Sequence, residues 1–458
     1  MAKIKTLYIC QSCGSHSPRW QGQCFVCKEW NTLVEEIVSN EVLKESKTKA
    51  WIDDNNISQA KTLENLKTPE KKERIQTNIK ELDRVLGGGL VSGSYTLLGG
   101  DPGVGKSTLL LQMLNTISAD SLYISGEESA EQIGLRASRL AVTNKKIQIA
   151  AESNLQLILE LVKKHKMKVL VIDSIQSIYL PDLNSAPGSV GQVRECSAKL
   201  MRLAKNKNIS VILIGHVTKD GGLAGPKVLE HMVDSVLSFE GDQQNQFRLL
   251  RSLKNRFGPS NELGVFQMLS SGLSEVHNPS EIFLSERQKN IVGSVVFSAI
   301  EGSRPLLCEV QALTTPSHLP MPRRTSSGVD ANRVHILIAV LDKYLNLKLN
   351  KSDVFINVVG GLKLQETAAD LSIIAALISS QNNISVPHDL CFFGEVGLTG
   401  EIRACTFAED RTKEAIKLGF TKIMAPFNNK KHLKGMDKTA KFFWVKHVKD
   451  LKNFSLLT

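Results

Sequence analysis

The chain has 458 residues, which at roughly 100 to 200 residues per domain corresponds to two to four domains. Hydrophobic residues make up 42% and charged residues 22%, ordinary globular values that exclude a largely disordered or fibrous chain. The longest apolar runs, 210–215 and 373–378, are far shorter than the roughly 18 residues of a membrane-spanning helix. The first ten residues lack the apolar region of a signal peptide. We therefore expect a cytoplasmic protein without a membrane partner.

The formal net charge is +11, a basic balance that permits nucleic-acid binding without requiring it. Most of the surplus lies near the C-terminus, where the stretch from Arg411 to Asn453 holds twelve Lys or Arg and three Asp or Glu. The remainder of the chain is close to neutral.

Four cysteines near the N-terminus form two C-x-x-C pairs that are separated by ten residues: Cys10, Cys13, Cys24 and Cys27. Each pair supplies two thiolates, so the four together complete the tetrahedral coordination of a structural Zn²⁺. A reducing cytosol favours this metal site over disulfides. The sequence therefore predicts a zinc ribbon over residues 1–33, followed by a polar linker over 34–75.

Two α/β regions follow the linker. Over 76–275, apolar strand-like runs at 95–98, 121–124, 169–172 and 211–214 alternate with segments of helical periodicity, a pattern typical of a parallel α/β sheet. Over 281–458, strand-like runs at 291–298, 308–312 and 354–359 precede a helical segment at 367–379. The sequence contains no internal repeat and no low-complexity tract.

A phosphate-binding loop opens the first α/β region. Residues 100–107 match the pattern G-x-x-x-x-G-K-[ST], directly after a strand and before a helix. In this motif Lys106 bridges the β- and γ-phosphates of ATP and the Ser107 hydroxyl binds Mg²⁺. The predicted nucleotide-binding residues are Gly100, Asp101, Pro102, Gly103, Val104, Gly105, Lys106, Ser107 and Thr108.

Four polar residues end or follow other predicted strands. Asp173 ends an apolar strand and is predicted to help hold Mg²⁺ as the Walker B acid. Glu127 and Glu128 follow the next strand after the phosphate-binding loop, and we choose Glu127 as the residue that activates the attacking water. His216 is either a sensor of the γ-phosphate or an ordinary structural histidine.

Three further motifs are E-L-D-R-V-L-G-G-G at 81–89, S-G-E-E-S at 125–129 and K-N-R-F-G at 254–258. Together with the cysteine quartet and the phosphate-binding loop, they make the whole chain resemble the bacterial RadA (Sms) family of DNA recombination and repair ATPases. The resemblance implies a RecA-like core in a homohexameric ring with ATP between subunits. It also implies a branch-migration helicase that translocates on single-stranded DNA, acts on branched DNA and works with a RecA-type recombinase.

The K-N-R-F-G motif contributes two cations. Lys254 and Arg256 lie two residues apart and therefore on one side of an extended segment. They are predicted to act on the γ-phosphate of a neighbouring subunit, and the alternative is a solvated basic turn.

Two Gly-rich segments are candidate DNA-binding loops. The segment 219–227 directly follows His216, and the segment 183–194 is the second candidate. Flexible loops with a few cations suit contacts to the phosphate backbone that do not depend on base sequence. The predicted DNA contacts are Lys219, Lys227 and Arg194.

Residues 354–379 and 394–403 resemble the proteolytic domain of Lon, which uses a serine nucleophile and a lysine base. Without gaps, these positions fall on Ala368 and Glu409, so both catalytic groups are missing. Ser372 and Lys413 lie about one helical turn further on, which leaves a displaced dyad conceivable. We expect an inactive Lon-like α/β domain that stabilises the ring.

The C-terminal lysines have two possible roles. Lys430, Lys431, Lys434, Lys438 and Lys441 form either a second DNA-binding surface or a solvated face. For the whole chain, the leading hypothesis is an ATP-driven DNA motor. The alternatives are an ATP-switched recombination mediator that does not unwind DNA and a Lon-like ATP-dependent protease.

Overall fold

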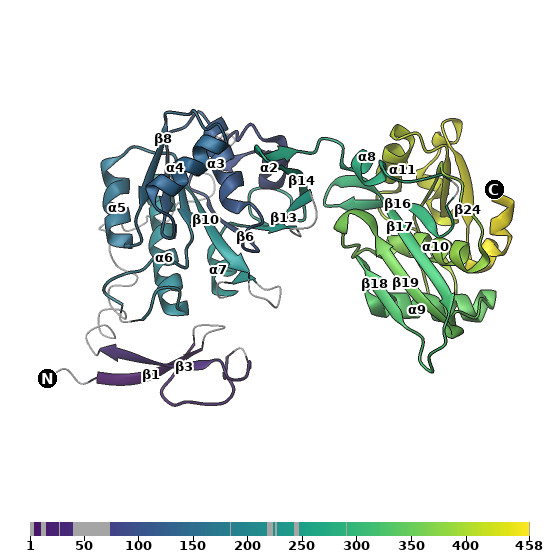
Figure 1. The fold of residues 1–458 in the computed structure, drawn as a ribbon, viewed down its shortest axis with the longest axis horizontal. Coiled ribbons are helices and arrows are strands. Elements are labelled where there is room, and N and C mark those ends of the chain that lie inside the picture. Colours follow the sequence, from purple (N-terminus) through teal and green to yellow (C-terminus); the bar gives the residue numbers. More distant parts are fainter. Residues whose placement is uncertain are drawn as a thin grey trace, which may run out of the picture. The chain divides into compact units, whose positions relative to one another are not determined.

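The computed structural model describes residues 4–10, 15–26, 28–39, 74–183, 185–217, 223–224, 227–241, 247–289 and 291–457. The chain divides into two compact units, Met1–Glu275 and Val276–Thr458 (Figure 1). The division lies at the predicted end of the first α/β region. Within the described ranges, every helix is too short or too polar to span a membrane.

The N-terminal segment is a three-stranded antiparallel sheet in the order β2-β1-β3. Its strands are β1 (Ile4–Cys10), β2 (His16–Ser17) and β3 (Leu33–Ser39). β3 pairs with β1 along its whole length, from Leu33 opposite Cys10 to Ser39 opposite Ile4. The predicted boundary at residue 33 is therefore six residues too early. The charged residues of β3 suggested a linker, but an antiparallel strand with a solvent-exposed side accommodates them.

The first α/β region forms a sheet whose long path runs β15-β14-β13-β12-β6-β10-β9-β7-β8, with β11 paired to β10. Its strands are β6 (Tyr95–Gly100), β7 (Ser121–Ser125), β8 (Ile147–Ala151), β9 (Val169–Asp173), β10 (Ser210–Val217), β11 (Leu223–Ala224), β12 (Ser235–Glu240), β13 (Phe247–Asn255), β14 (Leu263–Leu269) and β15 (Gly272–Glu275). All four predicted strands are present and parallel. The antiparallel extension β13–β15 was not predicted.

Helices cover both faces of this sheet. They are α2 (Lys80–Leu86), α3 (Lys106–Thr116), α4 (Ala130–Arg139), α5 (Leu155–Lys164), α6 (Val190–Lys207) and α7 (Lys227–Met232). Alternate strand residues enter two separate cores: Tyr123 joins the core with α2, α3 and α4, whereas Tyr95 joins the core with α5, α6 and α7. The result is a three-layer α/β architecture, in agreement with the RecA-like core that the family resemblance implied.

Two of the family motifs pack against each other in this unit. Gly87 follows α2 with φ +77°, and a Cβ atom built on Gly258 would lie 2.9 Å from the Cα of Gly87. Arg74, in β4 (Arg74–Ile75, paired with β5, Leu90–Val91), ties the same region together. Its guanidinium donates to the carbonyl oxygens of Phe257 at 2.5 Å and Gly89 at 3.3 Å. The glycines of both motifs thus allow a close backbone contact.

The second unit contains a seven-stranded sheet in the order β18-β19-β17-β16-β20-β23-β24. Its strands are β16 (Ser294–Glu301), β17 (Arg304–Pro316), β18 (Arg324–Ser327), β19 (Ser352–Val358), β20 (Leu390–Phe392), β23 (Lys422–Pro426) and β24 (Lys441–Val445), and a separate pair is β21 (Glu395–Val396) with β22 (Ile402–Arg403). The α-helices are α8 (Pro279–Leu284), α9 (Ala331–Leu345), α10 (Asp370–Asn382) and α11 (Ala408–Lys417). The mixed α/β character agrees with the sequence prediction.

We expect Gly258→Ala to destabilise the first unit by about 1–3 kcal/mol, because the added methyl group meets the backbone of Gly87. Gly134→Ala is the matched control. Gly134 lies within α4, and a Cβ atom there would have nothing within 4 Å, so this change is expected to stabilise by about 0.5–1 kcal/mol. Urea unfolding of both variants measures the difference. Equal stability of Gly258→Ala and wild type would contradict the close packing of the two motifs.

Candidate functional site

The phosphate-binding loop lies between β6 and α3, as predicted. Lys106 is 5% exposed, and its Nζ donates to the carbonyl oxygens of Gly100 at 2.8 Å and Asp101 at 2.9 Å. Burial lowers the pKa of Lys106, and the nearby carboxylates of Asp173, Asp101 and Glu127 oppose that shift. The ammonium group is thus held at the mouth of the loop, within the field of three acids.

Gly105 begins the helix that follows the loop. It has φ +112°, a conformation that side chains with a Cβ atom rarely adopt, and a Cβ atom there would lie 2.8 Å from Cε of Met268. The backbone conformation therefore requires glycine, whereas the Met268 methyl group is the end of a flexible side chain that can shift. This places the free N–H groups of the first turn of α3 toward the loop, where they suit a phosphate.

A buried tyrosine contacts one of the residues predicted to hold Mg²⁺. Asp173 ends β9, next to Ser125 in β7, and the Tyr123 hydroxyl donates to Oδ2 of Asp173. Ser107, the other predicted ligand, is the second residue of α3, directly after Lys106. The sequence analysis missed Tyr123. The alternation along β7 was the available signal, because it turns Tyr123 toward the core that contains α3.

The two glutamates after β7 have different partners. The Ser174 hydroxyl, directly after Asp173, donates to Oε1 of Glu127. Glu128 instead forms an ion pair with Arg136 of α4. Glu127 is therefore held beside the acid that ends β9, whereas Glu128 is turned toward a helix. This arrangement supports the choice of Glu127 for activating water.

His216 lies beside the start of the phosphate-binding loop through its backbone. β10 pairs with β6 so that His216 is next to Gly100, and it also pairs with Ala224 of β11. The position of its side chain is outside the described part of the structure. The backbone register nevertheless connects the loop to the segment predicted to bind DNA.

Lys254 and Arg256 both contact the junction between α7 and β12. The Nζ of Lys254 donates to the carbonyl oxygens of Glu230 at 2.7 Å and Val233 at 2.9 Å. Arg256 lies 3.5 Å from Asp234, and its side chain remains 58% exposed. Asp234 also accepts from the backbone N–H of Tyr95 at 3.1 Å. β13 ends at Asn255, so Lys254 lies in the strand and Arg256 in the bend that follows it. The partners in α7 and at Asp234 were not predicted.

These two cations lie at the end of the sheet opposite the phosphate-binding loop of the same chain. In β12, Ser235 pairs with both Thr96 and Asn255, whereas Phe239 pairs with Gly100. Four residues of strand separate these positions, a distance of about 13 Å. The K-N-R-F-G motif therefore stands at the amino ends of the parallel strands, and the loop stands at their carboxyl ends.

The predicted DNA-binding residues are only partly described. Lys219 is outside the described residues, and Lys227 begins α7 with a backbone that is described. Arg194 is exposed on α6. The prediction of a flexible segment over 183–194 is wrong for 190–194, which form the first turn of α6 behind the N-cap Ser189.

A buried glutamine orders part of the same segment. The Gln192 side chain is 1% exposed and donates to the carbonyl oxygens of Leu180 at 3.2 Å, Leu183 at 3.2 Å and Ser185 at 2.9 Å. Glycine content suggested flexibility, but one buried amide that satisfies several backbone groups outweighs it.

In the N-terminal ribbon, Cys10 and Cys24 are 0% and 1% exposed and pack in one small cluster with Leu33. Cys13 and Cys27 are outside the described residues. Two buried thiols from two different C-x-x-C pairs, brought together in a sheet too small for a large core, fit a Zn²⁺ site.

The displaced protease dyad is not assembled in the second unit. Ser372 is 0% exposed, and its hydroxyl donates to the carbonyl oxygen of Ala369 at 2.6 Å. The Lys413 side chain is 60% exposed and forms an ion pair with Glu409 at 2.6 Å. Lys413 therefore faces solvent while Ser372 is enclosed. This supports the expected loss of peptidase activity.

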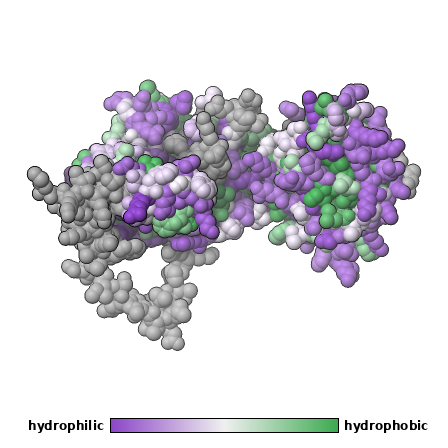
Figure 2. Space-filling model, turned by 90° about the horizontal axis from the view of Figure 1, so that it is seen from below, coloured by the Kyte–Doolittle hydropathy of each residue, from purple (hydrophilic) through white to green (hydrophobic). Residues whose placement is uncertain are grey.

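The five C-terminal lysines are all exposed. They lie on η5 (Phe427–His432), near η6 (Met436–Lys438) and on the sheet-edge strand β24. Beside them, the Lys446 Nζ is 4.1 Å from the centre of the Phe427 ring, and the rings of Phe442 and Trp444 stack at 4.8 Å. Hydrophilic residues cover most of the face of the second unit that Figure 2 shows, with a smaller hydrophobic area.

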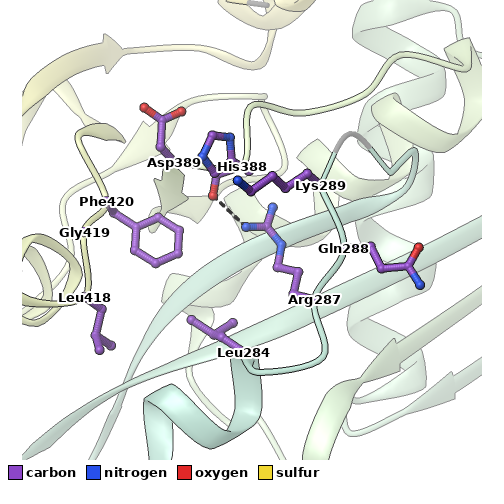
Figure 3. Close-up of a pocket in the computed structure, with 9 residues that line it drawn as sticks. All are labelled: Leu284, Arg287, Gln288, Lys289, His388, Asp389, Leu418, Gly419 and Phe420. Atoms are coloured by element: carbon purple, nitrogen blue, oxygen red, sulfur yellow. Dashed lines mark hydrogen bonds between the residues drawn. The ribbon is translucent and has the colours of Figure 1, made fainter.

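One pocket lies in the second unit, after α8 (Figure 3). Arg287 points toward His388 and donates to its carbonyl oxygen at 2.7 Å. The lining residues are Leu284, Arg287, Gln288, Lys289, His388, Asp389, Leu418, Gly419 and Phe420. No residue predicted for ATP or DNA lines this pocket. The candidate site therefore remains at the edge of the first sheet.

Family models match three parts of the chain. A model described as a rubredoxin metal binding domain matches residues 8–35, and a model described as an AAA domain matches residues 59–222. A model described as subunit ChlI of Mg-chelatase matches residues 327–429. These matches cover the cysteine ribbon, the phosphate-binding loop and much of the second unit.

Curated relatives match nearly the whole chain. Three proteins described as DNA repair protein RadA come from Bacillus subtilis, Pseudomonas aeruginosa and Rickettsia felis. They are 47%, 49% and 50% identical to this chain, and the matches cover 94%, 94% and 99% of it and the same shares of the relatives. Together with the geometry of the site, this agreement establishes the family: the chain belongs to the RadA DNA repair proteins, with a RecA-like ATPase fold as its core.

Proposed function

We propose that the chain is an ATP-driven DNA motor. It assembles as a hexameric ring in the cytoplasm, translocates on single-stranded DNA and drives branch migration during recombination. The observation that carries this proposal is the separation of Lys254 and Arg256 from the phosphate-binding loop of the same chain. Since these cations stand at the opposite end of the sheet, they reach a γ-phosphate only in a neighbouring subunit. Hydrolysis is then coupled to the relative position of two subunits.

Within one subunit, each residue has a distinct task. Lys106 binds the β- and γ-phosphates, and Glu127 orients the attacking water and accepts its proton. Ser107 and Asp173 offer the oxygen ligands that Mg²⁺ prefers, and Asp173 lies near the Lys106 ammonium group of the phosphate-binding loop, so the donor set fits this ion. When bound, Mg²⁺ neutralises charge that develops on the phosphates.

A short path through the chain links the nucleotide to DNA. His216 pairs with Gly100 and Ala224, and α7 begins three residues after Ala224. Lys254 holds the end of α7 through the carbonyl oxygens of Glu230 and Val233. A change at the phosphates therefore has a route through the segment 218–226 to the cation that serves the next subunit.

A second candidate function is an ATP-switched mediator that loads a RecA-type recombinase without unwinding DNA. Both functions use the same ATP site and the same DNA phosphates, and they differ only in whether hydrolysis drives strand separation. The Lon-like protease is the weakest alternative because Ser372 is buried, whereas Lys413 is exposed and paired with Glu409.

The motor is expected to unwind forked DNA with ATP and to fail with a non-hydrolysable analogue. Lys106→Ala removes the cation that bridges the phosphates and is expected to abolish both turnover and unwinding. Lys145→Ala, an exposed lysine in the same unit, is the matched control and should retain both. DNA-stimulated turnover without strand separation would favour the mediator.

Arg256 of a neighbouring subunit is expected to complete each active site. Arg256→Ala should bind ATP near normally and hydrolyse it poorly, since its guanidinium serves another subunit. Mixed with Lys106→Ala chains, it should regain turnover, because some junctions then pair an intact loop with an intact Arg256. A chain with both substitutions is the control and should rescue neither single variant. No rescue in mixed rings that mass spectrometry verifies would argue against a role between subunits.

The exposed C-terminal lysines are proposed to form a second surface for double-stranded DNA. Replacing Lys430, Lys431, Lys434, Lys438 and Lys441 with Gln is expected to weaken duplex binding. The slope of log affinity against log salt should flatten by about 0.9 for each contact removed. Turnover without DNA should stay unchanged because the first unit is untouched. A wild-type affinity with a wild-type salt slope would identify these lysines as a solvated face.

A further inference from the structure

Tyr123 is a polar residue in the core of the first unit that the ATP chemistry described above does not use. It is 0% exposed in the middle of β7, and its ring packs in the core that contains α3, the helix after the phosphate-binding loop. A buried tyrosine hydroxyl must find a hydrogen-bond partner, since burial without one costs free energy. The partner of this hydroxyl indicates its role.

The hydrogen-bond partner of the hydroxyl is a residue proposed to hold Mg²⁺. The hydroxyl donates to Oδ2 of Asp173, the last residue of β9. β7 and β9 are neighbouring parallel strands, with Tyr123 opposite Val171 and Ser125 opposite Asp173. The buried tyrosine therefore reaches the Asp173 carboxylate from the adjacent strand.

We propose that Tyr123 is a positioning residue for the divalent cation: its hydroxyl fixes the Asp173 carboxylate in the orientation that binds the metal with the nucleotide. The inference rests on the ATP site of the proposed function and deepens it. The rigid ring, fixed by core packing, holds the hydroxyl in place. Residues that hydrogen-bond to a metal ligand orient that ligand and tune the affinity for the metal.

A purely structural role is the competing explanation, and Tyr95 offers a matched comparison. Tyr95 is also 0% exposed, lies in β6 of the same sheet and donates its hydroxyl to the carbonyl oxygen of Ser197 at 3.0 Å. Its ring enters the opposite core, with α5 and α6. Tyr123→Phe and Tyr95→Phe each remove one buried hydrogen bond from the same sheet, but only the first removes a contact to a proposed metal ligand.

The test measures Mn²⁺ binding in the presence of saturating ADP, followed by the electron paramagnetic resonance signal of the free ion. Tyr123→Phe is expected to weaken Mn²⁺ affinity on the order of tenfold, as for the loss of one hydrogen bond to a charged group. Tyr95→Phe should leave the affinity unchanged. ADP affinity in EDTA should be equal in both variants and wild type. Similar melting temperatures of the two variants verify that both fold.

A double-mutant cycle with Asp173→Asn then isolates the contact. If Tyr123 acts through Asp173, the double variant should bind Mn²⁺ no more weakly than Asp173→Asn alone. Wild-type Mn²⁺ affinity in Tyr123→Phe, or an equal loss in Tyr95→Phe, would overturn the inference. These binding measurements need no DNA, so a failure to unwind DNA would refute the motor while leaving this result intact.

Discussion

The pairing of β12 with β6 on one side and β13 on the other is the constraint on which the site depends. In β12, Ser235 pairs with Thr96 of β6 and with Asn255 of β13, and Phe239 pairs with Gly100 of β6. It therefore fixes the phosphate-binding loop at one end of the sheet and the K-N-R-F-G motif at the other. A register shift of one residue would turn the side chains of β12 to the wrong core. The distance between the phosphate-binding loop and the K-N-R-F-G motif is therefore fixed by the sheet.

Asp234 anchors the second of these ends. It lies directly before β12, accepts from the backbone N–H of Tyr95 and pairs with Lys205 and Arg256. The carboxylate is 7% exposed, and such a buried charge is stable only when it is well paired. Its partners tie the start of β6 to α6 and to the exposed Arg256. The position of Arg256 is thereby coupled to the strand that leads into the phosphate-binding loop.

Sequence reasoning reached the parts of the site that are contiguous in the chain. The phosphate-binding loop, Asp173 after its apolar strand and the central parallel strands all follow from local pattern, because motif and periodicity act over a few residues. The contacts of Tyr123 with Asp173 and of Arg74 with Phe257 join residues 50 and 183 positions apart. No local pattern encodes such pairs.

Local composition also misled in two places. Glycines around 183–194 suggested flexibility, but the buried Gln192 side chain fixes the preceding loop and the helix begins at Val190. Charges after residue 33 suggested a linker, but β3 continues to Ser39. In both cases hydrogen bonding to more distant segments outweighed local composition. The Lon-like region behaved differently, since the burial of Ser372 and the exposure of Lys413 agree with the loss of the dyad expected from sequence.

The central claim is that one chain holds only part of an active site. It is tested most directly by ATP turnover per chain, measured against protein concentration over the range in which sedimentation shows monomers assembling. The division of the site predicts that monomers bind ATP but hydrolyse it at background rate, and that turnover rises in step with assembly. Monomers that hydrolyse ATP at the rate of the assembled protein would contradict the account.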